Sequence, residues 1–336
     1  MIRRRSFLVG LGGVVLGAGL RAECSSEAGK LVLSPPTGQC VLDGSVRQGV
    51  FMDTGTGRPE SGMFGNTRKY ADGSPRFHEG IDIAPVQPWR RDRNPTDVVR
   101  ASAPGLVVYI NQCRQNASLY GNYVVLTHEV PSFGVVYTLY AHLRRIDRSL
   151  KAGQQVPAGR ALGIMGHTPD FPLARAHLHF EVGVVMNRHY PLIDAQHGVW
   201  NGANLYGVDP CVAFTEQRRN GAFDIAAYLV HRPIAWGVQL EPGPRPDFFR
   251  RYPLFWRGEY RESWPMWVAF SREGIPVHGQ SIPPGVSIAK QFRGSSEELR
   301  KGRNWANPER GRILLENLLV SPSRSSQRFT RLGEVG

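Results

Sequence analysis

The stretch AHLHFEVGVV (residues 176–185) indicates both the fold and the chemistry of this chain. Its length and its apolar and β-branched residues favour a β-strand. Successive side chains of a strand point to opposite faces, so His177, His179 and Glu181 would share one face. Two imidazoles on one face can bind a single metal ion, although two histidines on a solvated face would give the same spacing.

Similar short apolar runs, separated by Gly and Pro, extend over residues 51–214. The clearest are GLVVYI (105–110), YVVLTH (123–128) and GVVYTLYAHL (134–143). Runs of this length and punctuation are typical of strands rather than helices. The pattern predicts a mainly β domain built as an antiparallel sheet or sandwich, with a charged loop inserted at 88–97.

Three segments flank this predicted domain. Residues 1–22 have a basic start, an apolar stretch and a small residue at the end, which is the layout of a secretory signal. Arg4 and Arg5 within it resemble a twin-arginine export signal, and an uncleaved membrane anchor is the alternative. Residues 23–50 read as a polar lead-in. Residues 215–336 form either a small mixed second domain or an extension packed on the first.

The C-terminal segment is basic and rich in tryptophan, because it holds five of the seven tryptophans of the chain. Exposed Trp and Arg can stack on sugars and pair with an anionic polymer, but Trp buried in a small core is the commoner arrangement. A helix is expected at 308–320 and a basic, disordered tail at 321–331. A wall-associating or groove-shaping role for this segment is the hypothesis.

The net charge of the 336-residue chain is +13, from 41 Lys and Arg against 28 Asp and Glu. Loss of residues 1–22 would remove four arginines and leave +9. Such a charge favours acidic partners, and outside the cytoplasm it favours a cell wall or membrane surface over nucleic acid. No apolar run beyond the N-terminal one reaches membrane-spanning length, so no stable membrane insertion is expected after cleavage.

The cysteines are few and widely spaced: Cys24, Cys40, Cys113 and Cys211. Without a C-x-x-C motif, a zinc knuckle or a redox dithiol is disfavoured. In an oxidising compartment the four residues could form two disulfides in any of three pairings, which the sequence does not rank.

Two more candidate ligands stand upstream of the H-x-H pair. RFHEGIDIAP (76–85) places His78 and Asp82 four residues apart, and His142 ends a predicted strand. One ion bound by His78, Asp82 and one histidine of the pair would have two nitrogen ligands and one oxygen ligand. That set suits zinc and leaves a position for water. The remaining imidazoles would lie nearby, able to move a proton or to stabilise an oxyanion.

The order H-x-x-x-D, YAHL and HLHFE, with GIDIAP, GNYVVLTH and VDPCVAF around it, resembles the M23 (LytM/lysostaphin-type) zinc metallopeptidases over about residues 62–212. The resemblance implies a mostly antiparallel β fold with the metal in a groove along one face. It also implies peptide cross-links or stem peptides of peptidoglycan as substrates. The extracytoplasmic location in a bacterium (periplasm or secreted), expected from residues 1–22, agrees with such a substrate. The oligomeric state stays open.

The same resemblance assigns roles to individual residues. It implies that His78, Asp82 and His179 bind one Zn²⁺ per chain. It further implies that His142 and His177 are the catalytic imidazoles.

Two other residues are candidates for supporting roles. Glu181 lies on the face of the H-x-H pair and could orient a ligand, although an ordinary strand glutamate would look the same. Arg68 stands shortly before the first motif and could hold a substrate carboxylate, with an exposed structural arginine as the alternative.

The leading hypothesis is therefore a zinc-dependent endopeptidase. The alternative is a catalytically inactive wall protein of the same fold that activates a separate amidase. Relatives of that second kind have typically lost metal ligands or catalytic histidines, and all five positions are present here.

Overall fold

The computed structural model describes residues 29–39, 41, 49–53, 57–69, 75–86, 95–168, 175–286 and 317–322. The predicted signal (1–22), most of the charged loop at 88–97 and most of the basic tail at 321–331 lie outside these residues, as do Cys24 and Cys40. Cys113 and Cys211 are not bridged to each other.

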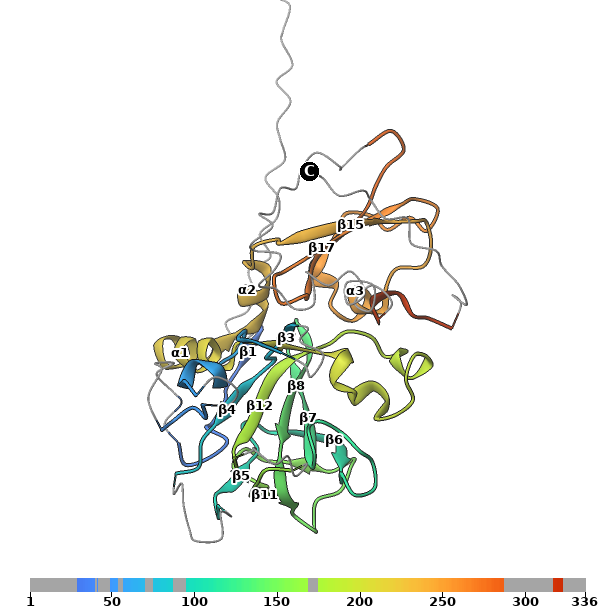
Figure 1. The fold of residues 1–336 in the computed structure, drawn as a ribbon. Coiled ribbons are helices and arrows are strands. Elements are labelled where there is room, and N and C mark those ends of the chain that lie inside the picture. The colour runs from blue at the N-terminus through green and yellow to red at the C-terminus, as the bar shows by residue number, and fades with distance from the viewer. Residues whose placement is uncertain are drawn as a thin grey trace, which may run out of the picture.

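Seven strands form one antiparallel sheet, as the short apolar runs predict (Figure 1). Its strand order is β10-β6-β7-β8-β12-β13, and β4 also pairs with β12. The members are β4 (Ile81–Ile83), β6 (Gly105–Asn111), β7 (Tyr123–Val130), β8 (Gly134–Ala141), β10 (Gln155–Val156), β12 (Leu178–Val185) and β13 (Leu205–Val208).

A second, three-stranded antiparallel sheet completes a sandwich with the first. It consists of β5 (Val98–Arg100), β11 (Ala161–Met165) and β9 (Leu143–Ile146), with β11 in the centre. Apolar side chains of this sheet, such as Val99 and Leu162, share one hydrophobic core with Val124 and Leu178 of the larger sheet. Burial of these β-branched and aliphatic side chains stabilises the sandwich.

The strand β12 lies at the centre of the molecule, and all eight of its residues are buried. One of its edges pairs with β8, and the other is shared by β4 at one end and β13 at the other end. In this register His179 lies opposite Asp82 of β4 on one side and opposite Ala141 of β8 on the other. The topology therefore joins motifs that are about a hundred residues apart in the sequence.

Helix α1 (Pro210–Asn220) leaves the sheet directly after β13. Asp209 caps its N-terminus by accepting a hydrogen bond from the Cys211 amide, and Pro210 occupies the first turn. Gly221 ends the helix with a φ of 80°, a left-handed conformation that glycine adopts without strain. The predicted domain boundary at residue 214 falls inside this helix.

Several short elements connect the sheets. Two-stranded pairs join β1 (Lys30–Leu31) with β14 (Phe223–Asp224), and β2 (Thr67–Lys69) with β3 (Pro75–Phe77). The helical turns are η1 (Pro59–Gly62), η2 (Tyr190–Leu192), η3 (Gly198–Trp200), η4 (Gly202–Asn204), η5 (Pro253–Phe255) and α2 (Ile225–Val230). Within the described ranges, no helix is both long and apolar enough to cross a membrane.

The C-terminal region (215–336) contains a sheet of its own, within residues 236–281. Its order is β15 (Trp236–Leu240), β17 (Met266–Phe270), β18 (Pro276–Ser281) and β16 (Trp256–Arg257), with α3 (Asp247–Arg251) beside it. In Figure 1 this sheet lies above the green strands of the sandwich, with α2 at the junction. Trp236, Trp256 and Trp267 are buried, and Trp264 is half-buried.

The C-terminal region packs directly on the sandwich. Arg251 donates to the carbonyls of Val185 and Met186, at 2.7 and 2.9 Å, and Tyr252 donates to the carbonyl of Val135 at 2.6 Å. The ring of Tyr252 also contacts Phe133. These contacts favour the extension packed on the first domain over an independent second domain.

Candidate metal centre

Three side chains converge where β4 meets β12. His78 stands just before β4, Asp82 lies on β4, and His179 lies opposite Asp82 on β12. Gly80 permits this close approach, because a Cβ atom at that position would come within 2.3 Å of the Phe180 carbonyl oxygen. The glycine of the H-x-x-x-D segment is therefore a steric requirement of the site.

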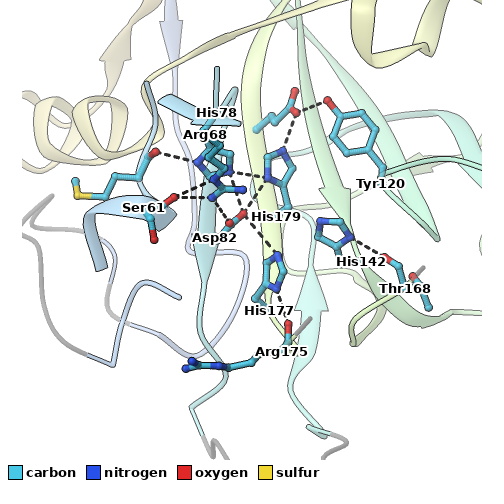
Figure 2. A network of polar contacts seen from close by, with 12 residues as sticks. Ser61, Arg68, His78, Asp82, Tyr120, His142, Thr168, Arg175, His177 and His179 are labelled. Atoms are coloured by element: carbon cyan, nitrogen blue, oxygen red, sulfur yellow. Dashed lines mark hydrogen bonds and ion pairs between the residues drawn. The ribbon is translucent and has the colours of Figure 1, made fainter. Parts of the chain in front are cut away.

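The ligand atoms of these three residues lie around one point (Figure 2). His78 Nε2 is 3.0 Å from Asp82 Oδ1 and 3.1 Å from His179 Nδ1. His179 Nδ1 is in turn 3.0 Å from Asp82 Oδ1. All three side chains are buried, so the group is shielded from bulk water.

The second nitrogen of each histidine fixes which nitrogen faces the centre. His78 Nδ1 donates to the Met63 carbonyl at 2.8 Å, and His179 Nε2 donates to Glu181 Oε1, also at 2.8 Å. A carbonyl or carboxylate oxygen can only accept, so these nitrogens carry hydrogen. Such contacts orient metal-binding imidazoles and leave the opposite nitrogen available to an ion.

Glu181 is itself held by two tyrosines. Tyr120 donates to Glu181 Oε1 at 2.7 Å and Tyr137 donates to Oε2 at 2.6 Å. The carboxylate is fully buried, and these bonds together with His179 keep it ionised and in place. The sequence pointed to Glu181 as an orienting residue but gave no sign of the two tyrosines.

Arg68 is directed at Asp82 rather than at open solvent. Its Nη2 lies 2.5 Å from Asp82 Oδ2 and donates to the Ser61 carbonyl at 2.6 Å. Asp82 Oδ2 is thereby engaged, and Oδ1 is the oxygen that faces the two histidines. The predicted contact between Arg68 and a substrate carboxylate stays a prediction.

Burial and neighbouring charges shift the pKa values of this cluster in opposite directions. Burial disfavours the charged form of His179, but hydrogen bonds to Asp82 and Glu181 outweigh it and raise its pKa to about 9. Burial lowers the pKa of His78. For Asp82, burial opposes ionisation, but the neighbouring histidines and Arg68 hold its pKa well below the usual range. The raised pKa favours a proton on His179 Nδ1, the ring nitrogen that lies 3.0 Å from Asp82 Oδ1.

Two more imidazoles lie beside the cluster, as the sequence predicted. The rings of His142 and His177 are 4.7 Å apart between centroids, and His177 Nε2 is 3.7 Å from Asp82 Oδ1. His142 Nδ1 donates to the Thr168 carbonyl and His177 Nδ1 to the Arg175 carbonyl, both at 2.7 Å. The Nε2 atom of each ring is thus the one available for proton transfer.

Burial lowers the pKa of both rings, and for His142 the neighbouring histidines lower it further, well below the ordinary value. Both are therefore neutral at neutral pH and can accept a proton at Nε2. His142 also has a φ of 61°, which is uncommon for a residue with a side chain. Such a conformation costs energy and occurs preferentially at functional sites.

His128, another strand histidine, is not part of the group. Its ring nitrogens bind the Pro104 carbonyl and the Thr138 hydroxyl, at 2.7 and 2.8 Å. It serves the packing of the sheet.

Comparison with known proteins finds one similar family. Residues 76–191 match the model of Peptidase family M23. The part of the chain around this match is called the M23 domain, after the family model that it resembles. No protein of curated function matches the chain.

Several solved structures are similar over part of the chain. A zinc-containing peptidase from Vibrio cholerae is 28% identical, with 36% of this chain and 31% of that chain covered and a TM-score of 0.26. Lysostaphin from Staphylococcus simulans is also 28% identical, with 32% and 37% covered and a TM-score of 0.24. The catalytic domain of the prophage-encoded M23 protein EnpA from Enterococcus faecalis is 26% identical, with 34% and 74% covered and a TM-score of 0.25. The chain spans about a third of the length of the first two proteins.

Proposed function

We propose that this protein is a zinc-dependent endopeptidase that hydrolyses peptide bonds in the cross-links or stem peptides of peptidoglycan. The observation that carries the proposal is the convergence of His78 Nε2, Asp82 Oδ1 and His179 Nδ1 around one point, with two further imidazoles alongside. The match to Peptidase family M23 supports the reaction class.

The donor set of two imidazole nitrogens and one carboxylate oxygen fits zinc, and three protein ligands are the number typical of a catalytic site. When bound, zinc supplies Lewis acidity and lowers the pKa of a coordinated water towards ~7. Arg68 holds Asp82 so that Oδ1 is presented to the ion, and Glu181 does the same for His179 Nδ1.

His177 and His142 would handle the protons. Because each ring is neutral and its Nδ1 donates to a carbonyl, Nε2 is a proton acceptor in the resting state. One of the two Nε2 atoms can take the proton of the attacking water and return it to the leaving amine. A ring protonated at Nε2 can also donate to the oxyanion of the tetrahedral intermediate.

The chain as a whole is proposed to work outside the cytoplasm of a bacterium. The basic, apolar and small-residue layout of residues 1–22 supports export, and the positive charge suits an anionic wall. Residues 51–214 would form the catalytic domain. The contacts of Arg251 and Tyr252 with the sandwich support a structural rather than a wall-binding role for the C-terminal region.

The test is digestion of purified muropeptides by the full chain, with zinc content measured on the same samples. We expect cleavage by the wild type, loss of cleavage in His177→Ala with zinc retained, and no change in His231→Ala, an exposed control histidine. Full zinc occupancy without cleavage of any wall type would contradict the proposal and favour the inactive activator of an amidase.

A further inference from the structure

Arg144 is an exposed arginine placed at the edge of the proposed catalytic pair. It lies two residues after His142, as the second residue of β9. In this strand Leu143 is buried, whereas Arg144 and Arg145 are exposed. Gly166 brings it close to the second imidazole. The Gly166 carbonyl accepts from the His177 amide at 3.0 Å, and a Cβ placed on Gly166 would come within 2.7 Å of the Arg144 Cβ.

The backbone at Arg144 is irregular. In the pairing of β9 with β11, Arg145 lies opposite Ile164 and Leu143 lies opposite Met165, which leaves Arg144 as an extra, unpaired residue. This is a β-bulge, a feature that re-aims a side chain and is common beside active sites. Immediately before it, His142 turns the chain in a left-handed conformation.

Hydrogen bonds from two side chains fix the backbone of the bulge. Asn122 Nδ2 donates to the Leu143 carbonyl at 2.8 Å, and the Thr168 hydroxyl donates to the same oxygen at 2.8 Å. The backbone N–H of Asn122 in turn donates to the Thr168 hydroxyl at 2.9 Å. The start of the Arg144 side chain is therefore fixed relative to His142, whose ring binds the Thr168 carbonyl.

The other exposed arginine beside the pair is already neutralised. Arg175 precedes His177 by two residues and forms an ion pair with Asp53 at 2.7 Å. Asp147, the acidic residue that follows β9, accepts from Ser149 and pairs with Arg160 at 3.5 Å. Within the described residues, the guanidinium of Arg144 has no ion-pair or hydrogen-bond partner of its own.

We propose that Arg144 binds a free carboxylate of the substrate peptide beside the scissile bond. The inference rests on the proposed function and specifies its substrate class: peptides that carry an ionised carboxylate near the cleaved amide, in preference to amidated peptides or neutral glycyl bridges. A guanidinium suits this role, because its fork of N–H donors matches a carboxylate in two parallel hydrogen bonds.

Arg145 provides a matched control on the same strand. It is equally exposed, but it pairs with Ile164, which in turn pairs with Val98 of β5. Its side chain therefore belongs to the outer face of the three-stranded sheet, together with Ile164 and Val98, and not to the bulge.

The experiment compares two synthetic muropeptides that differ only in whether one carboxylate beside the scissile bond is free or amidated. Steady-state rates are measured for the zinc-loaded wild type and for Arg144→Ala, Arg144→Lys and Arg145→Ala. We expect the wild type to prefer the free acid by about tenfold in kcat/KM, the magnitude of an exposed charge-assisted contact. Arg144→Ala should lose this preference through a higher KM with little change in kcat, Arg144→Lys should keep part of it, and Arg145→Ala should keep all of it.

Equal rates for the two peptides, or an unchanged preference in Arg144→Ala, would overturn the inference while the proposed hydrolysis stands. If the wild type cleaves neither peptide, the proposed function fails. Calorimetric binding of the same peptides to the same proteins then tests the carboxylate site independently of cleavage. Tighter binding of the free acid that Arg144→Ala abolishes would support the carboxylate site, and equal binding of both peptides would overturn it.

Discussion

The M23 domain and the C-terminal region both bury charged side chains, but the two regions use them differently. In the C-terminal region the buried carboxylate of Asp247 is neutralised by Arg251 at 2.7 Å and by Arg188 at 3.0 Å. In the M23 domain, ligand atoms of His78, Asp82 and His179 face one another around one point. The first arrangement fastens two parts of the chain together, whereas the second brings three potential metal ligands together around one point.

The same contrast holds for the aromatic residues. Tryptophan and arginine are abundant in the C-terminal region, yet Trp236 stacks on Phe270 with ring centroids 4.0 Å apart, and Trp256 packs on Phe249. In the M23 domain, Tyr120 instead reaches a carboxylate that orients a proposed ligand. Trp, Tyr or Arg therefore indicates a binding site only where its polar atoms lie close to the polar atoms of other functional residues.

The strongest way to test this contrast is to compare one residue from each region. His177→Ala should reduce kcat/KM about 1,000-fold, the usual range for loss of a positioned acid–base group, and leave zinc content unchanged. Trp256→Ala should instead lower the unfolding free energy by about 3 kcal/mol and leave kcat/KM per folded, zinc-loaded molecule unchanged. Muropeptide kinetics and denaturant unfolding check the pair. A Trp256→Ala protein that is stable but inactive would place the C-terminal region in the catalytic machinery.

Glu181→Gln should weaken zinc binding by about 10- to 100-fold, as is usual when the group that orients a metal-binding histidine is altered. Gln retains the shape of the side chain and an acceptor for Tyr120, but it lacks the charge that His179 Nε2 needs. Competition with a chromophoric chelator measures the change. Glu129→Gln, an exposed change on β7, is the control, and equal zinc affinities in the two variants would count against the orienting role.

Zinc binding should release about one proton at neutral pH. The pKa of His179 is raised to about 9 in the absence of metal, so the ring is protonated below that pH and must lose the Nδ1 proton to an ion. Apparent zinc affinity should therefore rise about tenfold per pH unit between roughly pH 7 and pH 8. Calorimetry in buffers of different ionisation enthalpy counts the proton. Zinc binding without proton release would show that His179 Nδ1 is not the ligand atom.

The smallest expected effect is in the C-terminal region. Asp247→Asn removes the charge that Arg188 and Arg251 share and should lower the unfolding free energy by about 1.5 kcal/mol, without any change in zinc affinity. Glu259→Gln, in an exposed pair with Arg261, should have no measurable effect. An equal loss of unfolding free energy in the two variants would show that the buried pairs of Asp247 stabilise the fold no more than the exposed pair of Glu259.

The same carboxylate gives a pH signature. Burial opposes ionisation of Asp247, but Arg251 and Arg188 outweigh it and lower its pKa to about 2. A group with a depressed folded-state pKa stabilises the fold above its unfolded pKa of about 3.9, and this contribution disappears as the pH falls towards 2. The stability difference between wild type and Asp247→Asn should therefore shrink in that window.

Much of the M23 domain could be predicted from local sequence, because strand alternation acts over a few residues. The runs at 105–110, 123–128 and 176–185 fall on β6, β7 and β12. The run at 134–143 covers β8 and the first residue of β9, with His142 between them in a left-handed conformation. The two-residue period puts His179 and Glu181 on one face. The H-x-x-x-D spacing likewise pointed to His78 and Asp82 as candidate ligands, and Asp82 lies on β4 beside β12.

The remaining features depend on pairing between distant strands. Spacing alone left open which histidine of the H-x-H pair faces Asp82, and the register of β12 against β4 brings His179 opposite that residue. Tyr137 is similar: it lies two residues from Leu139, which is the partner of Glu181 across β8 and β12, so only the register reveals its role. The burial of the C-terminal tryptophans depends on which strands pair in the C-terminal sheet, and amino-acid composition does not determine this pairing.

X-ray absorption at the zinc edge of the full, zinc-loaded chain is the decisive test of the proposed metal site at His78, Asp82 and His179. We expect one zinc per chain, with two imidazole nitrogens and further oxygen ligands at about 2.0–2.2 Å. We also expect Asp82→Asn to lower zinc occupancy. A sulfur shell at about 2.3 Å, or a spectrum and occupancy that Asp82→Asn leaves unaltered, would contradict the proposed site.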